Sequence, residues 1–300
     1  MKPLLGFNKE YSLDSLTYPV YGSFKLDGIR CLAKNGEPLS RKLLCIPNRF
    51  VRDCFMSNAD ALEGLDGELI VGKASAPDVY RKTMSGVMSH DGEPDFIFAV
   101  FDYWDTPQRP FVERFNRFYQ SQGSWPSWVK IVTQTELNSA DEVRAFEAEQ
   151  LAKGYEGVCL RYPNSLYKYG RYTLKEGALL KLKSFSDQDV RITAIHEAIR
   201  NDNEATVDEL GNTKRSHSKE GRTEGKGYVG SMEGVVVGGE HDGKPAGIGT
   251  FRGLTTADKT ALFENRNEYI GRIAKVKSFA HGMKDALRHG VFLDWRDARD

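Results

Sequence analysis

The chain has 300 residues, and its 40% hydrophobic and 28% charged content is typical of a folded globular protein. Its 42 basic and 42 acidic residues cancel, which excludes a strongly basic chain, so a polyanionic partner must be met by local clusters. The four cysteines lack C-x-x-C spacing, which argues against a zinc site or a secreted disulfide framework. No apolar signal core or membrane-length run occurs, so we expect a cytoplasmic protein without a membrane partner.

A hairpin is predicted near the N-terminus. Asn35-Gly36 is a two-residue turn signal between strands predicted over 24–34 and 37–41. This pairing places Lys25 at the start of the first strand and Ser40-Arg41 on the return strand.

Helices and strands then alternate as far as residue 183. Proline and capping signals, together with apolar spacing, predict helices after Pro47, over 77–88 and from the capping box at Ser139 to about Gly154. Short apolar runs predict strands over 68–71, 95–104, 156–161 and 179–183. The first part of the chain is therefore expected to be a mixed domain of helices and sheets.

A domain boundary is predicted where apolar strand density drops, at a hinge over 184–187. It separates a first domain over 1–186 from a second domain over 187–300. Five strands suited to a small barrel are predicted in the second domain, over 190–195, 228–237, 247–252, 272–280 and 291–295. The polar segment 201–226 has no periodicity and is expected to be a long loop.

Lys25 precedes an Asp27-Gly28 turn, and a lysine there can carry a nucleotide covalently. A lysine attacks phosphorus only when neutral, and its reference pKa is about 10.4, so the site must lower that pKa. Burial beside other cations does this, and the available cations are Arg30, Lys181 and Lys183. The twofold period of a strand puts Lys181 and Lys183 on one face, which suits a triphosphate; the alternative is a strand with solvated lysines.

Several short motifs occur in a fixed order along the chain. They are Lys25-x-Asp27-Gly28-x-Arg30, Ser40-Arg41, Asp66-Gly67-Glu68-Leu69, Phe101-Asp102, Glu156-Gly157-Val158-Cys159-Leu160-Arg161 and Leu180-Lys181-Leu182-Lys183. This order and chemistry resemble the covalent nucleotidyltransferases, namely ATP-dependent DNA ligases, RNA ligases and mRNA capping enzymes. The chain is most similar to compact viral and bacteriophage-type DNA ligases.

The resemblance implies an α+β fold: a nucleotidyltransferase (ATP-grasp-like ligase) domain of antiparallel sheets and helices, followed by an OB-fold β-barrel. It implies a monomeric enzyme that seals nicks between 5′-phosphate and 3′-hydroxyl ends in duplex DNA, through lysyl-AMP and adenylated DNA. ATP and Mg²⁺ (or Mn²⁺) would be its cofactors, and a bacterial cytoplasm or a phage-infected host its location. Replication, repair and recombination all remain open as roles.

The resemblance also assigns the residues of the site. Lys25 is the nucleophile, Glu156 contacts the metal, and Asp27 serves the later steps on DNA and is a second metal candidate. The remaining contacts to the nucleotide are Ser23 at the adenine edge, Phe101 stacking on the purine, Glu68 and Arg41 near the ribose, and Arg30, Lys181 and Lys183 at the phosphates. The tract 288–297 resembles the last motif of the family, and its cations Arg288 and Arg296 would then contact the departing pyrophosphate. The match is imperfect, because Gly290 stands where the family usually has proline and the ending of the tract departs from the family pattern. Arg299 is a further candidate for a pyrophosphate contact.

Three alternatives are weighed against a DNA ligase. Capping enzymes more often carry Asp at the position of Glu156 and Trp at the position of Leu182, and RNA ligases usually lack the C-terminal arginine motif. A non-catalytic nick-binding protein would have lost a charged motif residue, whereas all are present from Lys25 to Lys183. The basic residues of segment 201–226 are expected either to order against DNA or to remain solvated.

Overall fold

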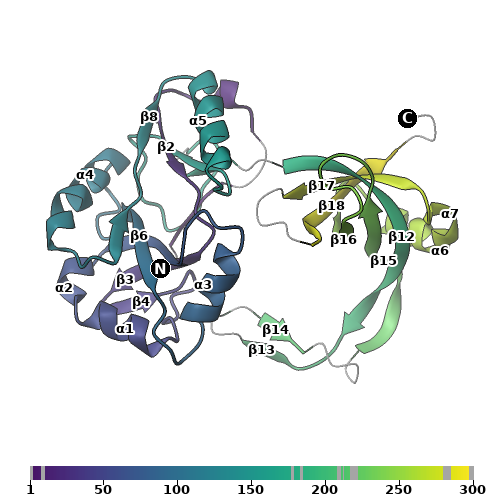
Figure 1. Cartoon of the computed structure of the whole chain (residues 1–300), viewed down its shortest axis with the longest axis horizontal. Coiled ribbons are helices and arrows are strands. Elements are labelled where there is room, and N and C mark those ends of the chain that lie inside the picture. Colours follow the sequence, from purple (N-terminus) through teal and green to yellow (C-terminus); the bar gives the residue numbers. More distant parts are fainter. Residues whose placement is uncertain are drawn as a thin grey trace. The chain divides into compact units, whose positions relative to one another are not determined.

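The computed structural model describes residues 3–7, 11–176, 179–182, 185–207, 211, 213–216, 222–279 and 285–296, without the side chains of 222–224. The chain divides into two compact units (Figure 1). The first comprises residues 1–183 with 208–212, and the second comprises residues 184–207 with 213–300.

Two sheets form the frame of the first unit. A five-stranded sheet has the order β4 (Glu37–Leu39), β3 (Ile29–Lys34), β5 (Leu65–Val71), β6 (Phe96–Tyr103) and β7 (Val129–Ile131). A four-stranded sheet has the order β11 (Leu180–Leu182), β9 (Val158–Arg161), β2 (Val20–Phe24) and β8 (Thr135–Leu137). A short pair joins β1 (Leu4–Leu5) to β10 (Gly170–Arg171). The sheets are mixed rather than purely antiparallel as expected, because β6–β7 and β1–β10 pair in parallel.

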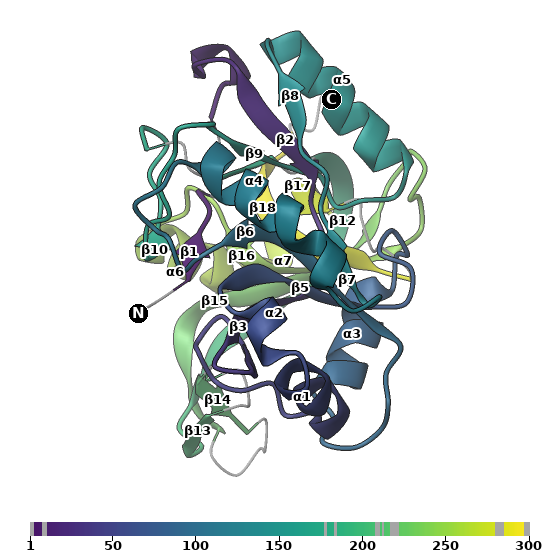
Figure 2. The same ribbon diagram turned by 90° about the vertical axis from the view of Figure 1, so that its left-hand side faces the viewer.

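Helices cover these sheets. They are α1 (Arg49–Met56), α2 (Ala59–Leu62), α3 (Val79–Val87), α4 (Phe111–Ser121) and α5 (Ala140–Ala152), with 3-10 turns at Leu13–Ser15 and Gln122–Ser124. The Asn48 side chain caps α1 by accepting the Val51 N–H, and Ser139 caps α5 by accepting the Glu142 N–H. Phe55 of α1 packs on Phe98 of β6 in the main core, and α5 lies beside β2 and β8 (Figure 2).

The second unit is built around five long strands. In the order β12 (Phe185–Asn201), β15 (Arg222–Val236), β16 (Pro245–Phe251), β18 (Leu287–Trp295) and β17 (Ile273–Phe279), they close into a barrel. Met232 and Phe292 are among the side chains buried in its core. Helices α6 (Thr256–Glu264) and α7 (Arg266–Tyr269) follow β16, and a hairpin of β13 (Ala205–Val207) and β14 (Thr213–Arg215) precedes β15. No helix in the described part of the chain is both long and apolar enough to cross a membrane.

Several expectations about local structure differ from what the structure shows. Lys25 follows β2 instead of starting a strand, and Ser40-Arg41 lie beyond the end of β4. The described residues of the predicted hinge over 184–187 belong to a strand, because β12 begins at Phe185, while the two units divide between residues 183 and 184. Segment 201–226, predicted to be a loop, contains β13, β14 and the start of β15. The strands β13 and β14 could not be predicted from apolar alternation, because their side chains are exposed on both faces.

Candidate active site

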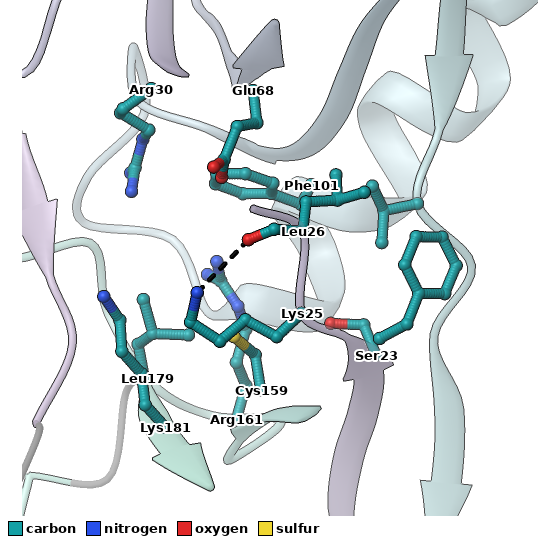
Figure 3. Close-up of a pocket in the computed structure, with 12 residues that line it drawn as sticks. Ser23, Lys25, Leu26, Arg30, Glu68, Phe101, Cys159, Arg161, Leu179 and Lys181 are labelled. Carbon is teal, nitrogen blue, oxygen red and sulfur yellow. Dashed lines mark hydrogen bonds between the residues drawn. The ribbon is translucent and has the colours of Figure 1, made fainter. Parts of the chain in front are cut away.

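Two adjoining cavities in the first unit share the side chains of Lys25, Arg30, Glu68 and Lys181. Their polar ends converge on a common space (Figure 3). The first cavity is also lined by Ser23, Phe24, Leu26, Phe101, Val132, Cys159, Arg161 and Leu179. The second is also lined by Leu5, Gly6, Gly28, Ile29, Arg41, Lys42 and Tyr80. One cavity thus has aromatic and apolar walls and the other has cationic walls, and Lys25 belongs to both.

Strand pairing explains why these residues meet. In the four-stranded sheet, Ser23 of β2 is opposite Cys159 of β9, which is opposite Lys181 of β11. The Lys25 N–H donates to the Gly157 carbonyl at 2.8 Å, which continues the pairing of β2 with β9 past the end of the strand. Gly28 is required because a Cβ there would lie 2.3 Å from the Leu69 carbonyl oxygen.

Lys25 is an ion-pair partner in this structure. Its Nζ donates to the Glu156 carboxylate and, at 3.2 Å, to the Leu26 carbonyl oxygen. Burial by itself lowers the pKa of Lys25, but the negative charges of Glu156 and Glu68 outweigh it, so this pKa lies above its ordinary value. The expectation of a lowered Lys25 pKa is therefore wrong for this structure, because the Glu156 carboxylate rather than a cation is the charged group nearest to Lys25.

The other charges of the site carry opposite shifts. Burial is the largest influence on Lys181 and lowers its pKa, and the cations of Lys25 and Arg30 act in the same direction. Burial also raises the pKa of Glu68, although Lys25 and a 2.8 Å hydrogen bond from the Gly28 N–H oppose it. The site thus holds charged groups that are only partly compensated without a ligand.

Phe101 reaches the first cavity through an irregularity of β6. Asp66 pairs with Asp102 and Gly67 with Val100, so Phe101 is the additional residue of a β-bulge. A bulge re-aims a side chain, and the ring, which taken alone would read as core, is half-buried and lines the cavity. The guanidinium carbons of Arg30 and Arg161 lie 4.7 and 5.6 Å from its centroid.

Two fully buried aspartates hold those arginines. Asp66 accepts Nε and Nη2 of Arg30, each at 2.5 Å. Asp102 accepts Nε of Arg114 at 2.8 Å and also pairs with Arg161. The two arginines beside the Phe101 ring, Arg30 and Arg161, are therefore each held by an aspartate that is buried in the core.

The remaining predicted site residues are placed differently. Arg41 lines the cationic cavity, whereas Asp27 is half-buried in the β2–β3 loop and is not among the described residues that line either cavity. Arg288 and Arg296 belong to the second unit, where Arg296 Nε donates to Asp189 at 2.9 Å. Lys183 and Arg299 lie outside the described residues.

Four lining residues with titratable side chains were not predicted as site residues from the sequence. Cys159 and Arg161 are two apart on β9, so the strand period that was applied to Lys181 and Lys183 would have identified them. Lys42 directly follows the Ser40-Arg41 motif and extends it. Tyr80, at the start of α3, carries no local signal for its place in the cavity.

The chain is similar in sequence to known proteins. Residues 12–183 match the family model described as the ATP dependent DNA ligase domain. The DNA ligase of Enterobacteria phage T4 is 22% identical over 232 residues, which cover 75% of this chain and 42% of the phage protein. The chain therefore spans less than half the length of that relative.

Solved structures extend the likeness to the second unit. The Chlorella virus DNA ligase–adenylate is 30% identical with a TM-score of 0.54, over 100% of this chain and 99% of the viral chain. A Lig E DNA ligase, at 21% identity and a TM-score of 0.68 over 92% of both chains, shares the fold. The mixed α+β architecture is thus that of DNA ligases, and the motifs around Lys25 fall within the matched domain. The chain belongs to the ATP-dependent DNA ligase family.

Proposed function

We propose that this chain seals nicks in duplex DNA with ATP, and that Lys25 carries the adenylate between the two substrates. The observation that carries the proposal is the position of Lys25, whose amine belongs to both an aromatic-walled and a cationic cavity. A base fits the first, where Phe101 offers a ring and Ser23 a hydroxyl. Phosphates fit the second, where Arg30, Arg41 and Lys181 supply positive charge.

In the first step, Lys25 Nζ attacks the α-phosphorus of ATP. The new bond joins Nζ to phosphorus, the bond to the bridging oxygen breaks, and pyrophosphate leaves with that oxygen. Lys25 must separate from Glu156 and lose a proton before it attacks, because the ion pair holds it as an ammonium. Arg30, Lys181 and Lys183 are the proposed phosphate contacts, and Glu68 and Arg41 the proposed ribose contacts.

The later steps transfer the adenylate to DNA and close the strand. A 5′-phosphate oxygen at the nick attacks the phosphorus of lysyl-AMP, and the bond to Nζ breaks. The 3′-hydroxyl then attacks the 5′-phosphate, a phosphodiester forms, and AMP leaves. Asp27, in the loop that follows Lys25, is the residue proposed to serve these steps.

A divalent cation fits this site. Among the described residues no group of three or more His, Cys, Asp or Glu side chains is placed to bind one. Mg²⁺ is ordinarily held by one or two carboxylates together with substrate phosphates, and Glu156 beside Lys25 meets that need. Bound Mg²⁺ or Mn²⁺ would shield phosphate charge during the attack.

We propose that the second unit is an OB-fold, and its closed five-stranded barrel supports this proposal. Five strands close into a barrel, with α6 and α7 between β16 and β17, and small five-stranded barrels of this kind bind nucleic acids. We assign residues 1–186 to an adenylation domain and 187–300 to an OB-fold domain. Arg288 and Arg296 of the latter are the proposed partners of pyrophosphate.

Incubation with ATP labelled at the α-phosphate tests the proposal. The wild-type protein should acquire an acid-labile label, and Lys25→Ala should acquire none. Lys153→Ala is the matched control, because Lys153 directly follows α5, forms an exposed ion pair with Glu149 and lines neither of the two cavities, so this variant should leave the label unchanged. Adding nicked duplex DNA should then discharge the label and produce a sealed strand.

Two results would reject the assignment. A label that persists in Lys25→Ala would place the adenylate on another residue, provided circular dichroism shows the variant to be folded. A labelled wild-type protein that is not discharged by nicked DNA would make the nucleic-acid substrate wrong.

A further inference from the structure

Tyr167 lies behind the cationic cavity and outside all the motifs used above. Its side chain is 3% exposed and packs in a small core with Leu4, Trp104 and Leu179. Its hydroxyl donates to Oδ2 of Asp66 at 2.6 Å. That oxygen is also the acceptor for Nη2 of Arg30, so one atom of a fully buried carboxylate joins the tyrosine to the arginine.

The same hydroxyl also bonds a strand that leads into the cavity. It accepts the Leu4 N–H at 3.3 Å, and Leu4 begins the short strand β1. Leu5 and Gly6, which follow, line the same cationic cavity as Arg30. Tyr167 is thus bonded through Asp66 to one residue that lines this cavity and directly to the strand that supplies two others.

The proton of Tyr167 is held in place for this role. Burial raises the pKa of Tyr167 well above its ordinary range, and the Asp66 carboxylate acts in the same direction. The hydroxyl therefore stays protonated at neutral pH and donates to the Asp66 carboxylate. Its lone pairs remain to accept the Leu4 N–H.

We propose that Tyr167 is a positioning residue for nucleotide binding, which acts by holding Asp66, and through it Arg30, against the cavity. Asp66 takes two nitrogens of Arg30, and a carboxylate fixed by a third donor holds that guanidinium in one orientation beside Phe101. Without the hydroxyl, Asp66 and Arg30 can turn together, and the guanidinium no longer meets the nucleotide in its prepared position. The inference rests on the proposed function, because it takes Arg30 to be a nucleotide contact.

Tyr167→Phe and Tyr172→Phe form a matched pair for the test. Tyr172 is 4% exposed, belongs to the same small core, and bonds the backbone of Leu166 and Lys168 rather than Asp66. Self-adenylation should be measured at increasing ATP concentration in both variants. Tyr167→Phe should raise KM for ATP about tenfold with little change in kcat, because a misplaced contact weakens binding at every stage. Tyr172→Phe should leave KM within twofold of wild type.

A double-mutant cycle separates positioning from a general loss of stability. In an Arg30→Lys background the bidentate pair with Asp66 is already gone, so adding Tyr167→Phe should change KM less than twofold. An unchanged KM in the single Tyr167→Phe variant, an equal rise in Tyr172→Phe, or a tenfold rise that persists in the Arg30→Lys background would each overturn the inference. Wild-type protein that is not labelled by ATP would instead reject the proposed function itself.

Discussion

Two groups of buried charge in the first unit differ in how fully they are compensated. Asp102 pairs with Arg114 and Arg161 and accepts the Tyr103 N–H. The side chains of the aspartate and the two arginines are at most 3% exposed. Glu68 lies on the neighbouring strand β5 and lines the cavities, with one backbone hydrogen bond. Burial raises the pKa of both acids, yet the arginines leave the pKa of Asp102 below its ordinary value, while the pKa of Glu68 stays above its own.

The difference separates a structural charge from a functional one. The charges of the Asp102 group are compensated within the folded protein, even though Arg161 also lines the first cavity. Glu68 and Lys181 are held in a cavity with too few opposite charges around each, which costs stability and leaves them ready to bind a substrate. Lys25 is compensated by Glu156, but the proposed reaction must break this ion pair.

The largest expected effect follows from breaking the Asp102 group. Asp102→Asn leaves Arg114 and Arg161 buried without their counter-ion, which should lower the free energy of unfolding by about 3–5 kcal/mol. Urea denaturation followed by circular dichroism measures this. A loss below about 1 kcal/mol would show that water or backbone groups replace the carboxylate, and the contrast with Glu68 would lose its basis.

Acid should weaken the same group selectively. A carboxyl group whose pKa is lowered on folding stabilises the protein above its unfolded pKa of about 3.9, and this stabilisation is lost as the pH falls through the lower folded value. The wild-type protein should therefore lose stability below about pH 4 more steeply than Asp102→Asn does. Parallel slopes in urea titrations between pH 3 and pH 6 would contradict the assignment of this loss to Asp102.

The sequence predicted those features of the site and the fold that depend on residues close together in the chain. The motifs identified Lys25, Glu68, Phe101 and Lys181, and the structure gathers their side chains around the two cavities. The Asn35-Gly36 turn and the capped helix α5 are also confirmed, because a two-residue turn and an N-cap are set by neighbouring residues.

The rest depends on contacts between distant segments. Asp66 and Tyr167 are 101 residues apart, and no spacing rule joins them. The Lys25 pKa was expected to fall because the cations were visible in the motifs, whereas its contact with Glu156, 131 residues away, was not. Helix α6 was missed although Thr255 and Asp258 form its capping box, because the two short strand signals around it dominated that region.

A smaller effect of opposite sign is expected at Glu68. A group whose pKa is raised on folding destabilises the ionised protein, and its favourable contribution is lost as the pH rises through that folded value. Glu68→Gln should therefore raise the temperature midpoint of unfolding at pH 7, because it removes the buried negative charge while the amide oxygen still accepts the Gly28 N–H. The same variant should weaken ATP binding. Thermal denaturation and self-adenylation should be measured on the same preparation. A lower midpoint would mean that Glu68 is compensated as fully as Asp102.

The smallest effect is expected where an ion pair lies in solvent. Asp91 pairs with Arg49 at 3.0 Å, and both side chains are more than 70% exposed. Asp91→Asn should change the free energy of unfolding by about 1 kcal/mol or less, because water solvates both groups when the pair is absent. The same urea titrations that measure Asp102→Asn provide this comparison, since both variants replace an Asp that pairs with an arginine. If Asp91→Asn destabilised the protein as much as Asp102→Asn, burial would not be what distinguishes the two pairs.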